Sequence, residues 1–141
     1  MRAFILAAGL GTRLKPLTDK MPKALVPVGG IPLLERQITT LKEYGYSDFV
    51  VNVHHFAEQI EQFLADKHNF GCRIAISDER DLLRETGGAI RHAAPLLEGS
   101  PSGAFLVHNV DIITDLDYGR LVPDPEAVAT LAVSSRRTNR Y

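Results

Sequence analysis

The sequence predicts a three-layer, Rossmann-like α/β fold, in which helices cover both faces of a mostly parallel sheet. Two observations predict it: short apolar runs rich in branched residues recur along the chain, and segments with helical periodicity alternate with them. With 141 residues, of which 45% are hydrophobic, the chain is long enough for one sizeable core. We therefore expect a single domain that spans residues 1–141.

Five apolar runs are candidate strands, each bounded by Gly, Pro, Asn or Asp. They lie at Ala3–Ala8, Phe49–Val53, Arg73–Ile76, Ala104–Val107 and Val128–Val133. Continuously apolar strands are typical of a parallel sheet that is buried on both faces.

Three segments between these runs carry apolar residues at helical spacing. The triplets are Leu34, Ile38 and Leu41, then Ala57, Ile60 and Leu64, then Ile90, Ala93 and Leu97. Alternation of strand and helix predicts right-handed crossovers and a parallel sheet.

The composition excludes several classes of protein. A formal net charge of -1 without a basic stripe argues against a nucleic-acid partner. The only cysteine, Cys72, cannot form an internal disulfide, and no apolar run has the length of a signal peptide or a membrane span. We expect a cytoplasmic protein without a membrane partner. No closing helix follows the last apolar run, so we also expect the fold to be truncated at the C-terminus.

Polar and glycine-rich residues follow four of the five candidate strands. In a parallel sheet, ligands bind beyond the carboxyl ends of the strands, and these residues therefore predict a site along one edge. They are Gly9–Arg13, Asn52–His55, Ser77–Glu79 and His108–Asp111.

The turn after the first strand resembles a phosphate cradle. Gly9 and Gly11 allow backbone amides to approach an anion, and the guanidinium of Arg13 suits bidentate phosphate binding. A plain strand-to-helix turn and a solvated surface arginine are the alternatives. The turn is not a Walker loop, since no Gly-Lys-Ser/Thr follows, and Leu14 replaces the third glycine of a dinucleotide fingerprint.

Lys23 lies between Pro22 and Pro27, which restrict the residues before them to extended conformations. We expect this segment to be extended and to hold Lys23 on a defined backbone. The alternative is a lysine that runs along the surface with its charge in water.

These motifs together resemble the signature of the nucleoside-diphosphate-sugar pyrophosphorylases, which are sugar-1-phosphate nucleotidyltransferases. The resemblance rests on Leu6-Ala7-Ala8-Gly9-x-Gly-Thr-Arg-Leu-x-Pro-Leu-Thr, followed by Pro22-Lys23-Ala24-Leu25-Val26-Pro27. It continues through Glu85-Thr86-Gly87-Gly88 to Asn109 and Asp111, and so covers nearly the whole chain. Within the family, the sequence looks most similar to the bacterial branch of mannose-1-phosphate guanylyltransferases and N-acetylmuramate-1-phosphate uridylyltransferases.

The resemblance implies a nucleoside triphosphate, GTP or UTP, and a sugar 1-phosphate as substrates, with Mg²⁺ as cofactor. It implies that Arg13 and Lys23 act in catalysis and that Asp111 holds the metal. Asn109 and His55 would contact the sugar phosphate, the latter because of its place beyond the second strand. The implied nucleotide-binding residues are Leu6, Ala7, Ala8, Gly9, Gly11, Thr12, Arg13, Lys23, Gly87 and Gly88. The oligomeric state stays open.

Simpler roles exist for several of these residues. Gly87–Gly88 opens a predicted helix whose free amides favour an anionic or polar ligand, but could form a plain turn. Asp111 suits a hard cation, but could cap a helix ahead of Ile112. His54 and His55 lack a third ligand at zinc spacing and are more simply rim or surface histidines.

One position departs from the family pattern. The family usually has glycine immediately before the metal-binding aspartate, whereas this chain has Val110. Valine does not easily adopt a positive φ, so either the backbone there is an ordinary extended one or the metal geometry differs.

Two other functions remain to be weighed against the transferase. A non-catalytic regulatory homologue that binds sugar nucleotides is disfavoured by the presence of Arg13 and Lys23. A dinucleotide-dependent oxidoreductase is disfavoured by Leu14 and by the absence of an acidic residue that ends the second strand.

Overall fold

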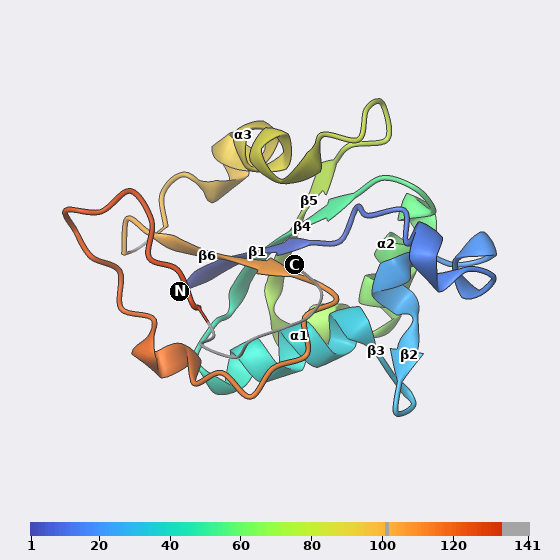
Figure 1. Cartoon of the computed structure of the whole chain (residues 1–141), viewed down its shortest axis with the longest axis horizontal. Coiled ribbons are helices and arrows are strands. Elements are labelled where there is room, and N and C mark those ends of the chain that lie inside the picture. Colours follow the sequence, from blue (N-terminus) through green and yellow to red (C-terminus); the bar gives the residue numbers. More distant parts are fainter. Residues whose placement is uncertain (101, 134–141) are drawn as a thin grey trace.

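The computed structural model describes residues 1–100 and 102–133 of the chain. At its centre is a four-stranded parallel sheet with the strand order β5-β4-β1-β6 (Figure 1). The strands are β1 (Arg2–Leu6), β4 (Asp48–Val53), β5 (Arg73–Asp78) and β6 (Phe105–Asn109). Four of the five predicted strands are therefore confirmed, and all four have their carboxyl ends at the same edge.

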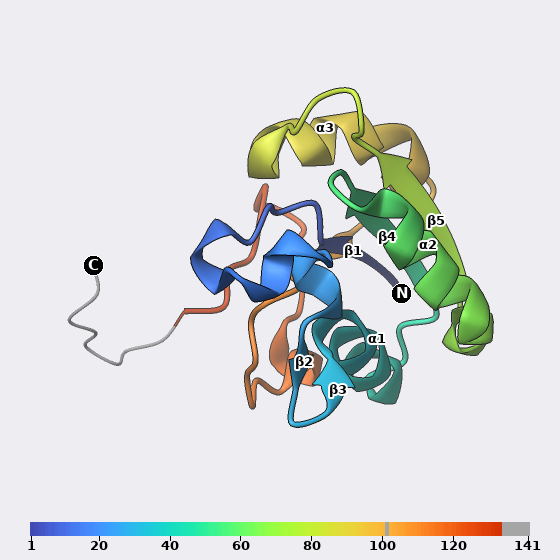
Figure 2. The ribbon, with the colours of Figure 1, turned by 90° about the vertical axis from the view of Figure 1, so that its right-hand side faces the viewer.

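The three predicted helices are also confirmed. They are α1 (Leu33–Glu43), α2 (Ala57–Asp66) and α3 (Glu85–Leu97). The larger core cluster joins α1 and α2 to one face of the sheet, and a smaller cluster joins α3 to the other face (Figures 1 and 2). The structure thus has the three layers that the sequence predicts.

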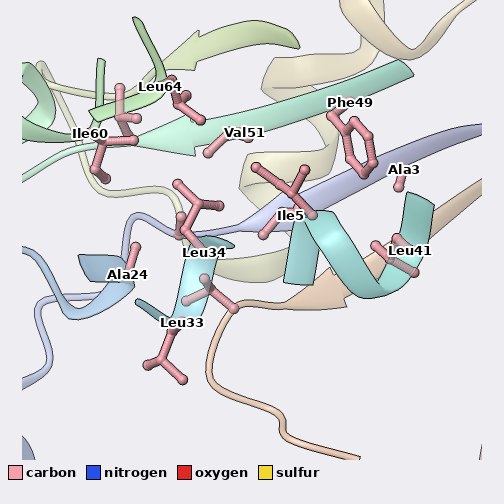
Figure 3. Close-up of a cluster of buried hydrophobic side chains, with 14 of the residues drawn as sticks. Ala3, Ile5, Ala24, Leu33, Leu34, Leu41, Phe49, Val51, Ile60 and Leu64 are labelled. Carbon is pink, nitrogen blue, oxygen red and sulfur yellow. The ribbon is translucent and has the colours of Figure 1, made fainter. Parts of the chain in front are cut away.

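Alternation along the strands decides which core each side chain joins. In β1, Ala3 and Ile5 face α1, whereas Phe4 between them packs with α3. All six residues of β4 are buried, because this strand lies inside the sheet and is covered on both faces. Figure 3 shows Phe49 and Val51 of this strand packed against leucines of α1 and α2.

The order of the strands reverses at β1. The first two crossovers place β4 and then β5 on one side of β1, but the third places β6 on its other side. Since α3 belongs to that third crossover, it lies on the opposite face of the sheet from α1 and α2. Such a reversal opens a crevice at the carboxyl ends of the two strands concerned, here β1 and β6.

The prediction of a fifth strand at Val128–Val133 is wrong. These residues form no regular structure, and Val128, Leu131 and Val133 are among the most exposed apolar residues described. Strand propensity is satisfied only by a neighbouring strand and a packed face, and within the described residues this segment has neither.

Short elements connect the larger ones. Strands β2 (Pro27–Val28) and β3 (Ile31–Pro32) form an antiparallel hairpin ahead of α1. The single 3₁₀ turns are η1 (Thr12–Leu14), η2 (Leu17–Asp19), η3 (Lys23–Leu25), η4 (His68–Gly71) and η5 (Tyr118–Arg120). No helix among the described residues is long and apolar enough to cross a membrane.

Candidate functional site

The predicted phosphate loop begins where β1 ends. The strand stops at Leu6, and the backbone amides of Ala7 and Ala8 turn away from the ladder to donate hydrogen bonds to Asn52 Oδ1, over 2.6 Å and 3.1 Å. Both alanines are buried. A side chain from the neighbouring strand therefore fixes the direction in which the loop leaves the sheet.

Gly11 is the tightest point of this loop. Its φ of 63° lies in the left-handed region, and a Cβ added to it would lie 2.8 Å from Thr18 Cγ2 and 3.0 Å from Lys23 Cβ. The carbonyl oxygen of Gly11 accepts hydrogen bonds from Thr18 Oγ1 and from the Leu14 amide, each at 2.8 Å. Glycine is thus required here for both conformation and space. Thr12 and Arg13 follow in η1, and both are exposed.

The prediction of an extended Pro22–Pro27 segment is only partly correct. Val26, the residue before Pro27, is extended with φ -61° and ψ 124°, but Lys23–Leu25 form a 3₁₀ turn. A proline restricts only the residue immediately before it, so the residues between the two prolines are free to turn. The turn is closed by a hydrogen bond from the Leu25 amide to the Pro22 carbonyl oxygen over 2.9 Å.

This turn brings Lys23 to the metal-binding aspartate predicted from the sequence. Lys23 Nζ lies 2.8 Å from Asp111 Oδ2, and a Cβ on Gly9 would lie 3.5 Å from the same nitrogen. The lysine side chain is 19% exposed, so most of it lies against the site. Gly9, Lys23 and Asp111, which come from three separate parts of the sequence, therefore lie together.

The charge of Lys23 controls the ionisation of Asp111. Burial raises the pKa of the Asp111 carboxyl, but the hydrogen bond and the positive charge of Lys23, with a smaller effect of Arg13, lower it further than burial raises it. The net pKa is below the ordinary value, and the carboxylate is ionised at neutral pH. An ammonium group carries three N–H donors, so Lys23 keeps donors for other oxygen atoms while bound to Asp111.

Backbone pairing between β1 and β6 places Asp111. Asn109, at the exposed end of β6, lies opposite Leu6, and the Val110 amide donates to the Leu6 carbonyl oxygen over 3.1 Å. Val110 is fully buried and does not have a positive φ. Valine therefore fits the backbone at this position, which lies in a turn directly after β6 and is not extended.

Arg13 is less constrained than Lys23. It is exposed and forms no ion pair with any residue in the ranges 1–100 and 102–133. Its positive charge nevertheless helps to lower the pKa of Asp111.

Gly87 and Gly88 lie in the first turn of α3. The helix begins at Glu85, so the expectation that these glycines lie in its opening turn is confirmed. Both glycines are exposed. A Cβ on Gly88 would lie 3.1 Å from Arg84 Cβ, whereas a Cβ on Gly87 would meet nothing within 4 Å. Close packing against Arg84 therefore accounts for the glycine at position 88.

The two histidines beyond β4, His54 and His55, differ in their contacts and exposure. His54 Nδ1 lies 2.7 Å from the Glu79 carbonyl oxygen, whereas His55 is exposed and stacks on the ring of Phe56 at 3.9 Å between centroids. The structure gives no contact between His55 and the Lys23–Asp111 pair.

A magnesium ion fits the donor set only in part. Within the described part of the chain, no group of three or more His, Cys, Asp or Glu residues could hold a metal ion. Asp111 offers one carboxylate, which suits an ion whose other ligands are substrate phosphates and water. Of the other aspartates near strand ends, Asp78 pairs with Arg80, and Asp117 caps η5 by accepting from the Gly119 amide.

An open hollow lies elsewhere. A cavity of about 450 Å³ between α3 and β6 is lined mainly by apolar residues, among them Leu97 and Phe105. These residues are at the carboxyl end of α3 and the amino end of β6. The cavity is thus at the opposite edge of the sheet from the predicted site.

Two residues at the edge that carries the predicted site received no individual role from the sequence. Asn52 and Glu79 are 3% and 0% exposed, and they connect the ends of β1, β4 and β5. The only signal was their position as polar residues at strand ends, since Asn52 precedes the last residue of β4 and Glu79 directly follows β5.

Comparison with known proteins identifies a family that matches this chain. The family described as nucleotidyl transferase matches residues 2–138. N-acetylmuramate alpha-1-phosphate uridylyltransferase of Neisseria meningitidis serogroup B is 45% identical over 118 residues, which cover 84% of this chain and 50% of that protein. A probable mannose-1-phosphate guanylyltransferase of Oryza sativa is 36% identical over 123 residues, 86% of this chain and 34% of that protein.

A solved structure shares the fold. HddC from Yersinia pseudotuberculosis, complexed with GMP-PN, superposes with a TM-score of 0.73 at 31% identity. The match covers 85% of this chain and 52% of that chain. The chain thus spans about half the length of these relatives or less.

Proposed function

Because the chain belongs to the nucleotidyl transferase family, we propose that it is the nucleotide-binding part of a sugar-1-phosphate nucleotidyltransferase. Residues 1–141 would form one domain that binds a nucleoside triphosphate and joins it to a sugar 1-phosphate. The observation that carries the proposal is the convergence of Gly9, Lys23 and Asp111 at the reversal between β1 and β6. A cytoplasmic location belongs to the same proposal, since both substrates are phosphorylated and do not cross membranes unaided.

The proposed reaction is a phosphoryl transfer of the in-line type. A phosphate oxygen of the sugar 1-phosphate attacks the α-phosphorus of the triphosphate and forms a new P–O bond. The bond between the α-phosphorus and the bridging oxygen of the β-phosphate breaks, and pyrophosphate leaves with that electron pair. The attacking phosphate is already an anion at neutral pH, so no general base is needed.

Like charges are the main obstacle to this reaction. Two unit charges about 4 Å apart repel by roughly 4 kcal/mol at an effective dielectric constant near 20. Lys23, held at the edge of the sheet, and Arg13, exposed in η1, supply positive charge to offset this repulsion. Amides of the Gly9–Arg13 loop would bind phosphate oxygens, with Asn109 and His55 toward the sugar phosphate.

Mg²⁺ is the proposed cofactor, and Asp111 is the residue that would hold it. Bound there with phosphate and water ligands, it would offset negative charge on the phosphates. Lys23 and the metal would then compete for the same carboxylate, and the donors of Lys23 would become free for phosphate oxygens.

A thermal-shift screen tests the proposal and indicates which nucleotide base the protein binds. Each of ATP, CTP, GTP and UTP is added with Mg²⁺, and we expect UTP or GTP to raise the melting temperature most. A ligand at about 100 times its Kd stabilises a protein by about 2.7 kcal/mol, which such a screen detects easily. If no triphosphate shifts the melting temperature, the proposal is wrong.

The same screen does not separate a transferase from a regulatory homologue that binds nucleotides. Exchange of labelled pyrophosphate into the triphosphate in the presence of the sugar 1-phosphate, measured on a chain of the relatives' full length, separates them, because only a transferase catalyses it. Lys23→Met is the matched variant, since it keeps an unbranched side chain of nearly the same length but removes its charge.

A further inference from the structure

A buried chain of hydrogen bonds runs across the sheet edge beneath the proposed site. Asn52 Oδ1 accepts from the Ala7 and Ala8 amides, and Asn52 Nδ2 donates to Glu79 Oε1 over 2.9 Å. Glu79 Oε2 accepts from the Arg84 amide over 3.2 Å. Two side chains thus connect the loop after β1 with the segment that enters α3.

The backbone of Glu79 is fixed as firmly as its side chain. Its amide donates to the Val53 carbonyl oxygen over 2.8 Å, and its carbonyl oxygen lies 2.7 Å from His54 Nδ1. Glu79 therefore cannot shift without disturbing the end of β4. Arg84, the last residue of the chain of bonds, packs where a Cβ on Gly88 would be.

A buried carboxylate is a costly way to fill space between two strands. Removing a charged carboxylate from water costs several kcal/mol even after relaxation of the protein, and two apolar side chains would pack the same volume at lower cost. Apolar side chains could not, however, hold the amides of residues 7, 8 and 84 in fixed directions. One end of the chain of bonds, at Ala7 and Ala8, lies among the residues that the family resemblance assigns to the nucleotide, and the other end, at Arg84, lies in the segment that leads to Gly87–Gly88.

We propose that Asn52 and Glu79 are positioning residues that hold the triphosphate loop in a fixed relation to the turn at Gly87–Gly88. This inference rests on the proposed function. Neither side chain touches the nucleotide, because both are buried. They act through the amides of Ala7 and Ala8 on one side and of Arg84 on the other.

A reciprocal exchange of the two side chains tests the inference. Asn52→Asp places two carboxylates against each other, and Glu79→Gln leaves an N–H group facing either Asn52 Nδ2 or the Arg84 amide. In the double variant, the new aspartate would accept from Ala7, Ala8 and the new glutamine, whose oxygen would accept from Arg84. Every bond is then restored with the same net charge.

Calorimetry measures the Kd of the triphosphate selected by the thermal-shift screen, with Mg²⁺, for the four proteins. Loop amides that lose their fixed direction make weaker hydrogen bonds to phosphate, and a hydrogen bond to a charged group contributes about 1.5 to 3 kcal/mol, so we expect each single variant to bind about 10- to 150-fold more weakly. We expect the double variant to bind within about threefold of the unsubstituted chain.

Asp48→Asn is the matched control, because it removes a buried carboxylate at the opposite end of the same strand. It should lower the free energy of unfolding without changing nucleotide affinity. If single variants do not fold, the double variant decides alone: binding within about threefold of the unsubstituted chain supports the inference, and weaker binding or failure to fold overturns it.

Two negative results have different meanings. Equal affinity of the single variants and the unsubstituted chain would overturn the positioning role while leaving the proposed function intact. Absence of triphosphate binding by the unsubstituted chain would overturn the proposed function and, with it, this inference.

Discussion

Lys23 Nζ and Asp111 Oδ2 lie 2.8 Å apart, although 88 positions separate the two residues in the sequence. The pair forms because a 3₁₀ turn after β1 and the strand end of β6 meet at the same edge of the sheet. A cation and a carboxylate are thereby fixed where the sheet reverses its order, which is the expected place for a phosphorylated ligand.

Arg13→Ala should weaken triphosphate binding without unfolding the protein. Arg13 is exposed and pairs with no described residue, so its loss should cost little stability. A charge-assisted hydrogen bond contributes about 1.5 to 3 kcal/mol, so the Kd measured by calorimetry should rise by about 10- to 150-fold. Arg120→Ala, at another exposed arginine, is the control and should leave the Kd unchanged. Equal affinities for both variants would remove Arg13 from the site.

Gly11→Ala should cost more stability than a positive φ alone explains. Gly45 has φ 81° and nothing within 4 Å of an added Cβ, so Gly45→Ala isolates the backbone cost of about 1 to 2 kcal/mol. At Gly11 the added atom also meets Thr18 and Lys23, which should add at least about 1 kcal/mol. Urea unfolding of both variants measures the difference, and equal losses would contradict the crowding.

Asp48→Asn should lower the free energy of unfolding at neutral pH and make that free energy less dependent on pH in the acidic range. Burial raises the pKa of Asp48, but Arg2 and Arg73 lower it further, so the folded-state pKa lies below the ordinary value of 3.8. Its contribution is therefore complete above pH 3.8 and is lost as the pH falls through the folded-state pKa.

The loss at neutral pH should be about 2 to 4 kcal/mol, because both arginines lose their partner. Urea unfolding at neutral and acidic pH compares the two proteins. The difference between them should shrink as the pH falls below 3.8, and a constant difference would contradict the low pKa.

Val110→Ala should lower the free energy of unfolding without changing the affinity for the triphosphate. Val110 is fully buried beside the predicted metal ligand, and loss of its methyl groups should cost about 1 to 3 kcal/mol. Val122 is 70% exposed, so Val122→Ala should change stability by less than about 0.5 kcal/mol. Triphosphate affinity should be the same in both variants; a selective loss in Val110→Ala would show that this side chain shapes the ligand site.

The 141-residue chain should bind a nucleoside triphosphate but form little nucleotide-sugar. The predicted nucleotide contacts lie within the chain, whereas only Asp111 brings a carboxylate to the Lys23 site among the described residues. Calorimetry and a pyrophosphate-release assay measure the two properties. Full turnover would mean that a second carboxylate is unnecessary or is supplied by the chain, and Asp78, Asp115 and Asp117 would then be the residues to substitute.

The sequence by itself determined the layers of the fold and the edge that carries the site. Four apolar runs and three helical triplets were sufficient to predict the layers. A strand buried on both faces has a continuous apolar run, and a helix buried along one stripe has apolar residues at helical spacing. Gly11 was also recognisable, since few other residues adopt its backbone conformation. The family signature gave Lys23 and Asp111 separately.

Only the tertiary structure decided which of these residues meet. Pairing of Lys23 with Asp111 depends on the reversal of strand order at β1, and sequence periodicity does not encode the order of strands. The run at Val128–Val133 has strand propensity but no strand beside it in the described structure, so propensity alone misled. The positioning role of Asn52 and Glu79 could be recognised only from their hydrogen-bond partners in the structure. A polar residue at a strand end has the same local sequence pattern whether it faces water or binds a buried amide.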